Sequence, residues 1–125
     1  MSNSEISKKI LLVEDNELNL KLFADLLEAN GYRVIQSKDG NNLKEIAYAE
    51  APDLIIMDIQ LPNISGMDLI QELKHDEKLN AIPIIAVTAF AMSEDKQNIL
   101  SSGCEEYISK PISINIFLET VKKYI

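Results

Sequence analysis

Short runs of apolar, mostly β-branched residues recur along the chain, and longer segments with helical spacing separate them. The runs occupy residues 10–13, 33–36, 54–57, 84–87 and 107–109. The first, third and fourth runs are continuous and do not alternate with polar residues, which is typical of parallel strands that are covered on both faces. The pattern therefore predicts a sheet of buried parallel strands.

The segments between the runs place apolar residues on one stripe of a helix. The predicted core-facing stripes are Leu22, Phe23, Leu26 and Leu27, with Asn19 and Asn30 extending them; Leu43, Ile46 and Ala47; Met67, Ile70 and Leu73; Ile99 and Leu100; and Phe117, Leu118 and Val121. Strict alternation of strands and helices predicts a doubly wound α/β fold. The chain of 125 residues accommodates one such domain, over residues 8–125, after a flexible tail at residues 1–7.

Composition narrows the range of partners. The chain has 12 basic and 20 acidic residues and a net charge of −8, which argues against the basic surface that nucleic acid or an anionic membrane requires. The apolar runs are too short to span a bilayer, and the polar N-terminus lacks the apolar core of a signal peptide. The single cysteine, Cys104, cannot form an internal disulfide. We therefore expect a cytoplasmic protein that does not insert into membranes.

Polar side chains stand at the carboxyl ends of the predicted strands, where doubly wound sheets bind their ligands. Glu14 and Asp15 follow the first run, Asp58 the third, Thr88 the fourth and Lys110 the fifth. Carboxylates this close together resist ionisation, and a hard divalent cation such as Mg²⁺ relieves the conflict. We expect Asp15 and Asp58 to bind the cation directly and Glu14 to bind it through water. Mn²⁺ should be able to replace Mg²⁺.

The same residues predict phosphoryl chemistry. A carboxylate such as Asp58 can attack a phosphoryl group and form an acyl phosphate. The metal and Lys110 would neutralise the phosphoryl oxygens during this transfer, and the Thr88 hydroxyl can bond the added oxygens. We therefore expect reversible phosphorylation of Asp58.

Several motifs follow one another in a familiar order. They are Leu11-Leu12-Val13-Glu14-Asp15-Asn16, Pro52-Asp53-Leu54-Ile55-Ile56-Met57-Asp58, Leu61-Pro62, Gly66-Met67, Val87-Thr88-Ala89 and Tyr107-Ile108-Ser109-Lys110-Pro111. With these motifs the chain resembles the receiver domain of response regulators over residues 8–125. Segments such as Gly103-Cys104-Glu105-Glu106-Tyr107 further resemble single-domain cell-cycle regulators of alphaproteobacteria. The resemblance implies a flavodoxin-like, five-stranded parallel sheet of strand order 2-1-3-4-5.

The resemblance also implies roles for individual residues. Asp58 would be the phosphoacceptor, and the backbone carbonyl of Gln60 would be a further metal ligand. Thr88 and Tyr107 would form the switch pair. The Lys110-Pro111 peptide bond would be cis, with the lysine binding the phosphoryl group.

The resemblance to this family further implies that the protein is a signalling protein and not an enzyme that turns over a separate substrate. The partners would be histidine kinases, phosphatases and other signalling proteins, and the protein would be a monomer or weak dimer. Because the chain ends at Ile125, where the fifth helix is finishing, we expect its output to be docking onto other proteins or transfer of the phosphoryl group to a further protein of a phosphorelay. Gln60 and Phe90 would set the lifetime of the phosphoryl group, because Gln60 lacks acid–base chemistry and Phe90 excludes water.

Apolar residues near the predicted site indicate a docking surface. Leu18 and Leu20 lie roughly 100° to either side of Asn19 on the first helix. Ile112 and Ile114 make the segment after the Lys110 position apolar. We expect these residues to pack against the helices of a kinase. The alternative is that Leu18 and Ile114 are half-buried against their neighbours.

Two other functions fit parts of the pattern. An aspartate-nucleophile phosphatase carries a general acid two residues after its nucleophile, where this chain has Gln60. A flavodoxin-like cofactor carrier shares the topology, but Glu14 and Asp15 would repel the phosphate that its first loop holds. Hydrolysis of a small phosphate ester would identify the phosphatase, and a yellow purified protein would identify the flavin carrier.

Overall fold

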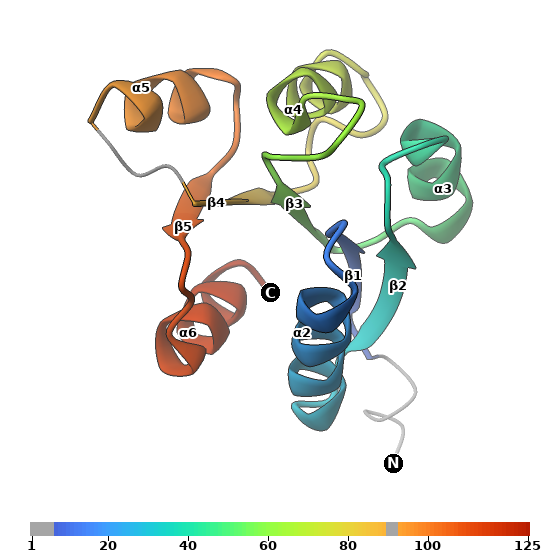
Figure 1. Ribbon diagram of the computed structural model, residues 1–125. Helices are drawn as coiled ribbons and strands as arrows, with labels where there is room; N and C mark the ends of the chain where they lie inside the picture. The colour runs from blue at the N-terminus through green and yellow to red at the C-terminus, as the bar shows by residue number, and fades with distance from the viewer. Residues whose placement is uncertain (1–6, 90–92) are drawn as a thin grey trace.

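In the computed structural model, which describes residues 7–89 and 93–125, strands and helices alternate along the chain (Figure 1). The strands are β1 (Lys9–Val13), β2 (Arg33–Ser37), β3 (Leu54–Asp58), β4 (Ile84–Thr88) and β5 (Glu106–Ser109). The helices are α2 (Glu17–Ala29), α3 (Leu43–Glu50), α4 (Gly66–Lys74), α5 (Ser93–Ser101) and α6 (Ile114–Tyr124). The strands form one parallel sheet in the order β2-β1-β3-β4-β5, which confirms the predicted fold and strand order.

Each strand coincides with a predicted apolar run and extends one residue beyond it at one end. Of the tail predicted at residues 1–7, only Ser7 is among the described residues. Within residues 7–89 and 93–125, no helix combines the length and the apolar character needed to cross a membrane.

Helices cover both faces of the sheet. In Figure 1, α2 and α6 lie on one face, and α3, α4 and α5 lie on the other. Successive strand residues point to opposite faces, so in β3 Ile55 joins the core beneath α3, α4 and α5, whereas Ile56 joins the core beneath α2 and α6. Phe23 of α2 and Phe117 of α6 bring their ring centroids within 5.2 Å in the second core. Burial on both faces explains why the apolar runs of β1, β3 and β4 are continuous.

Helix α2 packs on the sheet through a different stripe from the one predicted. Its buried residues are Leu20, Phe23, Ala24 and Leu27, at spacings of three and four residues. Leu22, predicted in the core, is 48% exposed, and Leu20, predicted on a docking surface, is only 8% exposed. Both predictions are wrong. They assume that the large leucines Leu22 and Leu26 define the buried stripe, whereas the helix is rotated so that Leu20 and the small Ala24 face the core. Leu100 on α5 is also 46% exposed, contrary to the prediction.

The segment between β3 and α4 passes close to the end of β3 at Gly66. The Gly66 N–H donates to the Ile59 carbonyl at 3.1 Å, and an isolated antiparallel bridge joins Gln60 to Ser65. A Cβ added at Gly66 would lie 2.4 Å from the Asp58 carbonyl oxygen and 2.7 Å from the Ile59 Cα. Because both neighbours are backbone atoms, this position has no room for a side chain.

We expect Gly66→Ala to lower the free energy of unfolding by about 1–3 kcal/mol, because the added methyl group forces the segment away from the end of β3. Urea denaturation measures the difference. Ser65→Ala is the matched control, since Ser65 is exposed and makes no capping hydrogen bond; it should stay within about 0.5 kcal/mol of the parent protein. A Gly66→Ala variant as stable as the parent protein would contradict the close approach.

Candidate functional site

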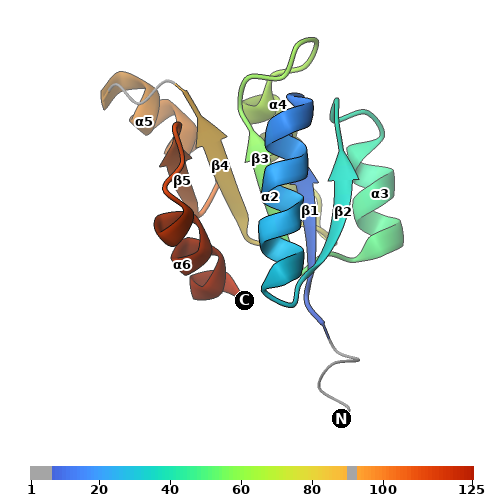
Figure 2. The same cartoon turned by 60° about the horizontal axis from the view of Figure 1, so that its bottom comes forward.

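The sheet carries a set of polar residues to one edge. Figure 2 shows the arrowheads of the parallel strands pointing toward the same edge. Asp58 ends β3 and Thr88 ends β4, while Glu14 and Asp15 follow β1 and Lys110 follows β5. The register of the paired strands aligns these ends. The structure thus brings together the residues that the sequence predicts at this edge.

Three of these residues form a cluster of carboxylates. One ligand oxygen each of Glu14, Asp15 and Asp58 lies within 4.8 Å of the other two. Glu14 is 1% exposed and Asp58 is 2% exposed, and Asp15 is partly exposed. Mg²⁺ favours carboxylate oxygens combined with water and phosphate oxygens, so this donor set fits a hard divalent cation. No second group of acidic, histidine or cysteine side chains converges in this way within the described part of the chain.

The Lys110 ammonium lies between two of the carboxylates. Its Nζ is 3.4 Å from Glu14 Oε1 and 3.4 Å from Asp58 Oδ2. The other oxygen of each carboxylate accepts a backbone hydrogen bond: Asp58 Oδ1 from Gln60 N at 2.9 Å, and Glu14 Oε2 from Asn16 N at 3.2 Å. Each carboxylate is therefore held in place between the lysine and an N–H group of the loop that follows it.

The crowding changes the ionisation of Glu14. Burial, and after it the neighbouring charge of Asp58, raises the pKa of Glu14 from 4.5 to about 7. The hydrogen bond from Asn16 and the charge of Lys110 act in the opposite direction and offset only part of this rise. The site without a cation therefore retains a proton at a pH where an ordinary glutamate has lost it.

Gln60 connects the ends of β3 and β4 through its side chain. Its Nε2 donates to Thr88 Oγ1 at 3.0 Å, and its Oε1 accepts a hydrogen bond from Ala89 N at 3.1 Å. Thr88 is only 1% exposed. The family resemblance implies a metal-binding role for the Gln60 carbonyl, but nothing in the sequence indicates these contacts of the side-chain amide. They depend on how the two strand ends are aligned in space.

Three further predictions for this site concern Tyr107, the peptide bond before Pro111 and Phe90. Tyr107 on β5 is partly buried and packs against the core beneath α3, α4 and α5. The Lys110-Pro111 peptide bond is cis, which confirms the prediction. Phe90, predicted to exclude water, lies outside the described residues.

Apolar residues flank the site beside α2 and the segment between β5 and α6. A cavity of about 520 Å³ is lined by Asn19, Leu22, Phe23, Ala89, Lys110, Pro111 and Ile112. Leu18 is 80% exposed and Ile114 is 49% exposed, whereas Ile112 is partly buried. Leu20 faces the core and does not belong to this surface, and Leu22 lines the cavity instead.

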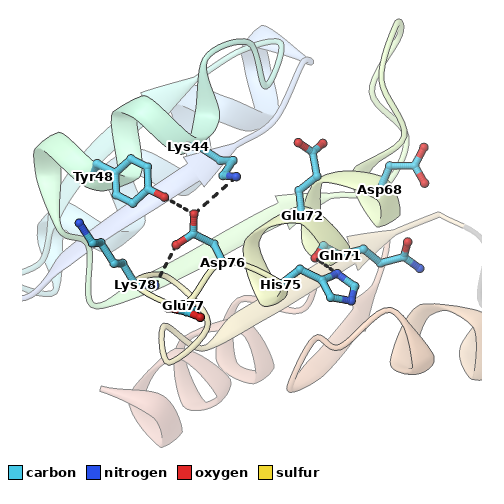
Figure 3. A pocket seen from close by; sticks show the side chains of 9 residues that line it. All are labelled: Lys44, Tyr48, Asp68, Gln71, Glu72, His75, Asp76, Glu77 and Lys78. Carbon is cyan, nitrogen blue, oxygen red and sulfur yellow. Dashed lines mark hydrogen bonds and ion pairs between the residues drawn. The ribbon is translucent and has the colours of Figure 1, made fainter.

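A larger cavity, of about 690 Å³, lies between α3 and α4 and is lined mainly by polar side chains (Figure 3). Asp76 accepts a hydrogen bond from the Tyr48 hydroxyl and lies 3.4 Å from Lys44 Nζ. In Figure 3 the Glu72 carboxylate and the His75 ring point in different directions. His75 is exposed. The charged groups here do not converge on one point, so the carboxylates at the strand ends remain the candidate site.

Comparisons with known proteins match this fold and this site. The response regulator receiver domain family matches residues 10–122. The polar-differentiation response regulator DivK of Brucella ovis is 53% identical over 120 residues, which are 96% of this chain and 98% of the relative. The receiver domain of the Pseudomonas aeruginosa sensor histidine kinase PA1611, solved with a magnesium ion in its active site cleft, has a TM-score of 0.86 and 33% identity, covering 94% of this chain and 97% of that one. The BeF3-activated receiver domain of Klebsiella pneumoniae RstA has a TM-score of 0.86 and 27% identity, with coverages of 94% and 97%.

The Mg²⁺ affinity of the carboxylate cluster should fall as the pH falls below about 7, the pKa of Glu14. Below this pH the cation has to displace a proton from Glu14, whereas above it the carboxylate is already charged. We expect the dissociation constant to be about ten-fold higher at pH 6 than at pH 8. Calorimetric titrations in two buffers of different ionisation enthalpy measure both the affinity and the proton released.

Glu14→Gln is the matched variant, because it keeps the shape of the side chain but cannot titrate. Its Mg²⁺ affinity should not vary with pH in this range. Without Mg²⁺, the fold of the parent protein should lose stability as the pH rises from 4.5 to about 7, because the folded state binds this proton more tightly than the unfolded chain. Equal proton release by the parent protein and by Glu14→Gln would show that the proton belongs to another group.

Proposed function

The chain belongs to the response regulator receiver domain family, and on this premise we propose that it accepts a phosphoryl group on Asp58 in the presence of a divalent cation. Phosphorylation would switch its binding to partner proteins. The observation that carries the proposal is the cluster of Glu14, Asp15 and Asp58 at the carboxyl edge of the sheet, with the Lys110 ammonium between Glu14 and Asp58.

Asp58 is the nucleophile in this proposal. One of its oxygens attacks the phosphorus of a phosphohistidine, the P–N bond breaks, and the imidazole nitrogen keeps the electron pair of that bond. Mg²⁺ or Mn²⁺, held by Asp15, Asp58, the Gln60 carbonyl and, through water, Glu14, would neutralise charge on the phosphoryl oxygens. Lys110 Nζ, 3.4 Å from Asp58 Oδ2, is close enough to bind one of those oxygens.

The phosphoryl group would leave by hydrolysis of the acyl phosphate. The domain then catalyses only its own phosphorylation and dephosphorylation and turns over no separate substrate. The Gln60 amide cannot give and recapture a proton as the general acid of an aspartate-nucleophile phosphatase does. Gln60 and Phe90 would instead prolong the lifetime of the acyl phosphate.

The switch would run through Thr88 and Tyr107. A phosphoryl oxygen on Asp58 would draw the Thr88 hydroxyl toward it, and the Tyr107 ring would turn into the space vacated. Thr88 is buried on β4, and Tyr107 is partly buried on the neighbouring β5. The register supports the coupling, because it pairs Tyr107 with Ala86, which lies two residues before Thr88 and on the same face of the sheet.

The partners would be histidine kinases, phosphatases and other signalling proteins in the cytoplasm, with the chain a monomer or weak dimer. The name of the relative, a polar-differentiation response regulator, supports a role in cell-cycle or division control. Kinase helices would pack on the apolar surface beside Lys110, formed by Leu18, Leu22, Ile112 and Ile114.

Asp58→Asn keeps the shape of the side chain and removes the nucleophile, so we expect it to abolish stable labelling by a cognate histidine kinase and radiolabelled ATP. Removal of the divalent cation by a chelator should abolish labelling of the parent protein, because the carboxylate cluster repels a further anion. Asp68→Asn, on the exposed side of α4, is the matched control and should be labelled normally. Label retained at the parent level by Asp58→Asn, or undiminished transfer in chelator, would refute the assignment.

Leu18→Glu should slow phosphoryl transfer from the cognate kinase by at least about five-fold, because a charge replaces an apolar contact in the docking surface. Phosphorylation by acetyl phosphate should stay close to the parent rate, since this donor needs only the metal site. Leu100→Glu, the matched control, places the same charge at a 46% exposed leucine on α5 and should leave both routes intact. Equal slowing of both routes by Leu18→Glu would place the residue outside a docking role.

A further inference from the structure

Gln60 contacts both the candidate phosphoacceptor and the candidate switch residue. Its backbone N–H donates to Asp58 Oδ1 at 2.9 Å. Its side-chain Nε2 donates to Thr88 Oγ1 at 3.0 Å, and its Oε1 accepts from Ala89 N at 3.1 Å. Gln60 thus connects Asp58, the carboxylate that would be phosphorylated, to Thr88 at the end of β4, which would respond to phosphorylation.

The orientation of this amide follows from the groups that it faces. A backbone N–H can only donate, so the atom that faces Ala89 is the amide oxygen and the atom that faces Thr88 is the nitrogen. The backbone of Gln60 is held as well, because it bridges to Ser65 and the preceding Ile59 N donates to the β4 carbonyl of Val87 at 2.9 Å. The Thr88 hydroxyl is therefore bound from a fixed point at the end of β3.

We propose that the Gln60 side chain is an intramolecular latch that holds Thr88 in its unphosphorylated position. This inference rests on the proposed function, in which the Thr88 hydroxyl moves to a phosphoryl oxygen. That movement separates Oγ1 from Nε2, while Oε1 stays anchored to Ala89 N. Gln60 therefore opposes the switch and sets the fraction of phosphorylated protein that adopts the switched state.

Phosphorylation also acts on the latch through the backbone. The carboxylate of Asp58 accepts the Gln60 N–H as a charged acceptor, and charge-assisted hydrogen bonds are stronger than neutral ones. Once one oxygen of Asp58 bonds to phosphorus, the remaining oxygen is an uncharged carbonyl. The hydrogen bond that anchors Gln60 then weakens, so the modification loosens the latch that opposes the switch.

Gln60→Met tests the latch, because methionine has a similar length and no amide. The probe is beryllofluoride, a mimic of the acyl phosphate, added at saturating Mg²⁺. The ¹⁹F NMR signal of bound beryllofluoride measures binding in every variant, and fluorotyrosine at Tyr107 reports the switch. The half-saturating concentration of beryllofluoride should fall by about two-fold to ten-fold, which is the change in equilibrium that the net contribution of one hydrogen bond corresponds to. Without the probe, the amide proton of Ala89 should exchange with solvent faster than in the parent protein.

Further variants separate the latch from packing. Gln60→Ala should shift the half-saturating concentration in the same direction as Gln60→Met. In a Thr88→Val background, which removes the hydroxyl and keeps the shape, Gln60→Met should give no further gain. Gln71→Met is the matched control, since Gln71 is an exposed glutamine on α4, and it should bind beryllofluoride like the parent protein.

The latch would be overturned if both Gln60 variants bound beryllofluoride no more tightly than the parent protein. An equal gain from Gln60→Met with and without the Thr88 hydroxyl would overturn it as well. These results leave the phosphoacceptor role of Asp58 intact. Failure of the parent protein itself to bind beryllofluoride would overturn the proposed function, and the latch with it.

Discussion

The carboxylates of Glu14 and Asp58 lie at the same edge of the sheet with one lysine between them, and this arrangement is electrostatically unfavourable without a cation. Strands β1 and β3 are covered on both faces, so neither side chain can relieve the repulsion by turning to solvent. Lys110, 3.4 Å from each, offsets part of it, but burial and, after it, the charge of Asp58 still raise the pKa of Glu14. A cation and a phosphoryl group complete the site together, because the cation balances the cluster and allows a further anion to bind.

Most of this edge could be predicted from the sequence because each central strand is a continuous apolar run that ends at a polar residue. Such runs mark strands covered on both faces, and parallel strands bring their carboxyl ends to one edge. Glu14, Asp58, Thr88 and Lys110, which stand at the ends of these runs, are therefore predicted to lie together. Family resemblance adds the cis peptide bond before Pro111, which the structure confirms.

Features that depend on side-chain fit could not be predicted in this way. The buried stripe of α2 could include either Ala24 or Leu22. The helix packs with the smaller Ala24 against the sheet and leaves Leu22 exposed, and the hydrophobic pattern alone does not predict this choice. The amide of Gln60 reaches Thr88 only because the end of β3 is aligned with the end of β4. In both cases the contacts of the side chains depend on how the helices and strands are arranged in three dimensions, which the residue types alone do not predict.

Chemical trapping can show which carboxylate of the protein becomes phosphorylated. The protein would be incubated with acetyl phosphate and Mg²⁺ and reduced with borohydride, which converts an aspartyl phosphate to homoserine, and its peptides would be analysed by mass spectrometry. We expect homoserine in place of Asp58, at no other carboxylate, and only when the divalent cation is present. Homoserine in place of Asp15, or equal conversion of Asp58 in chelator, would contradict it.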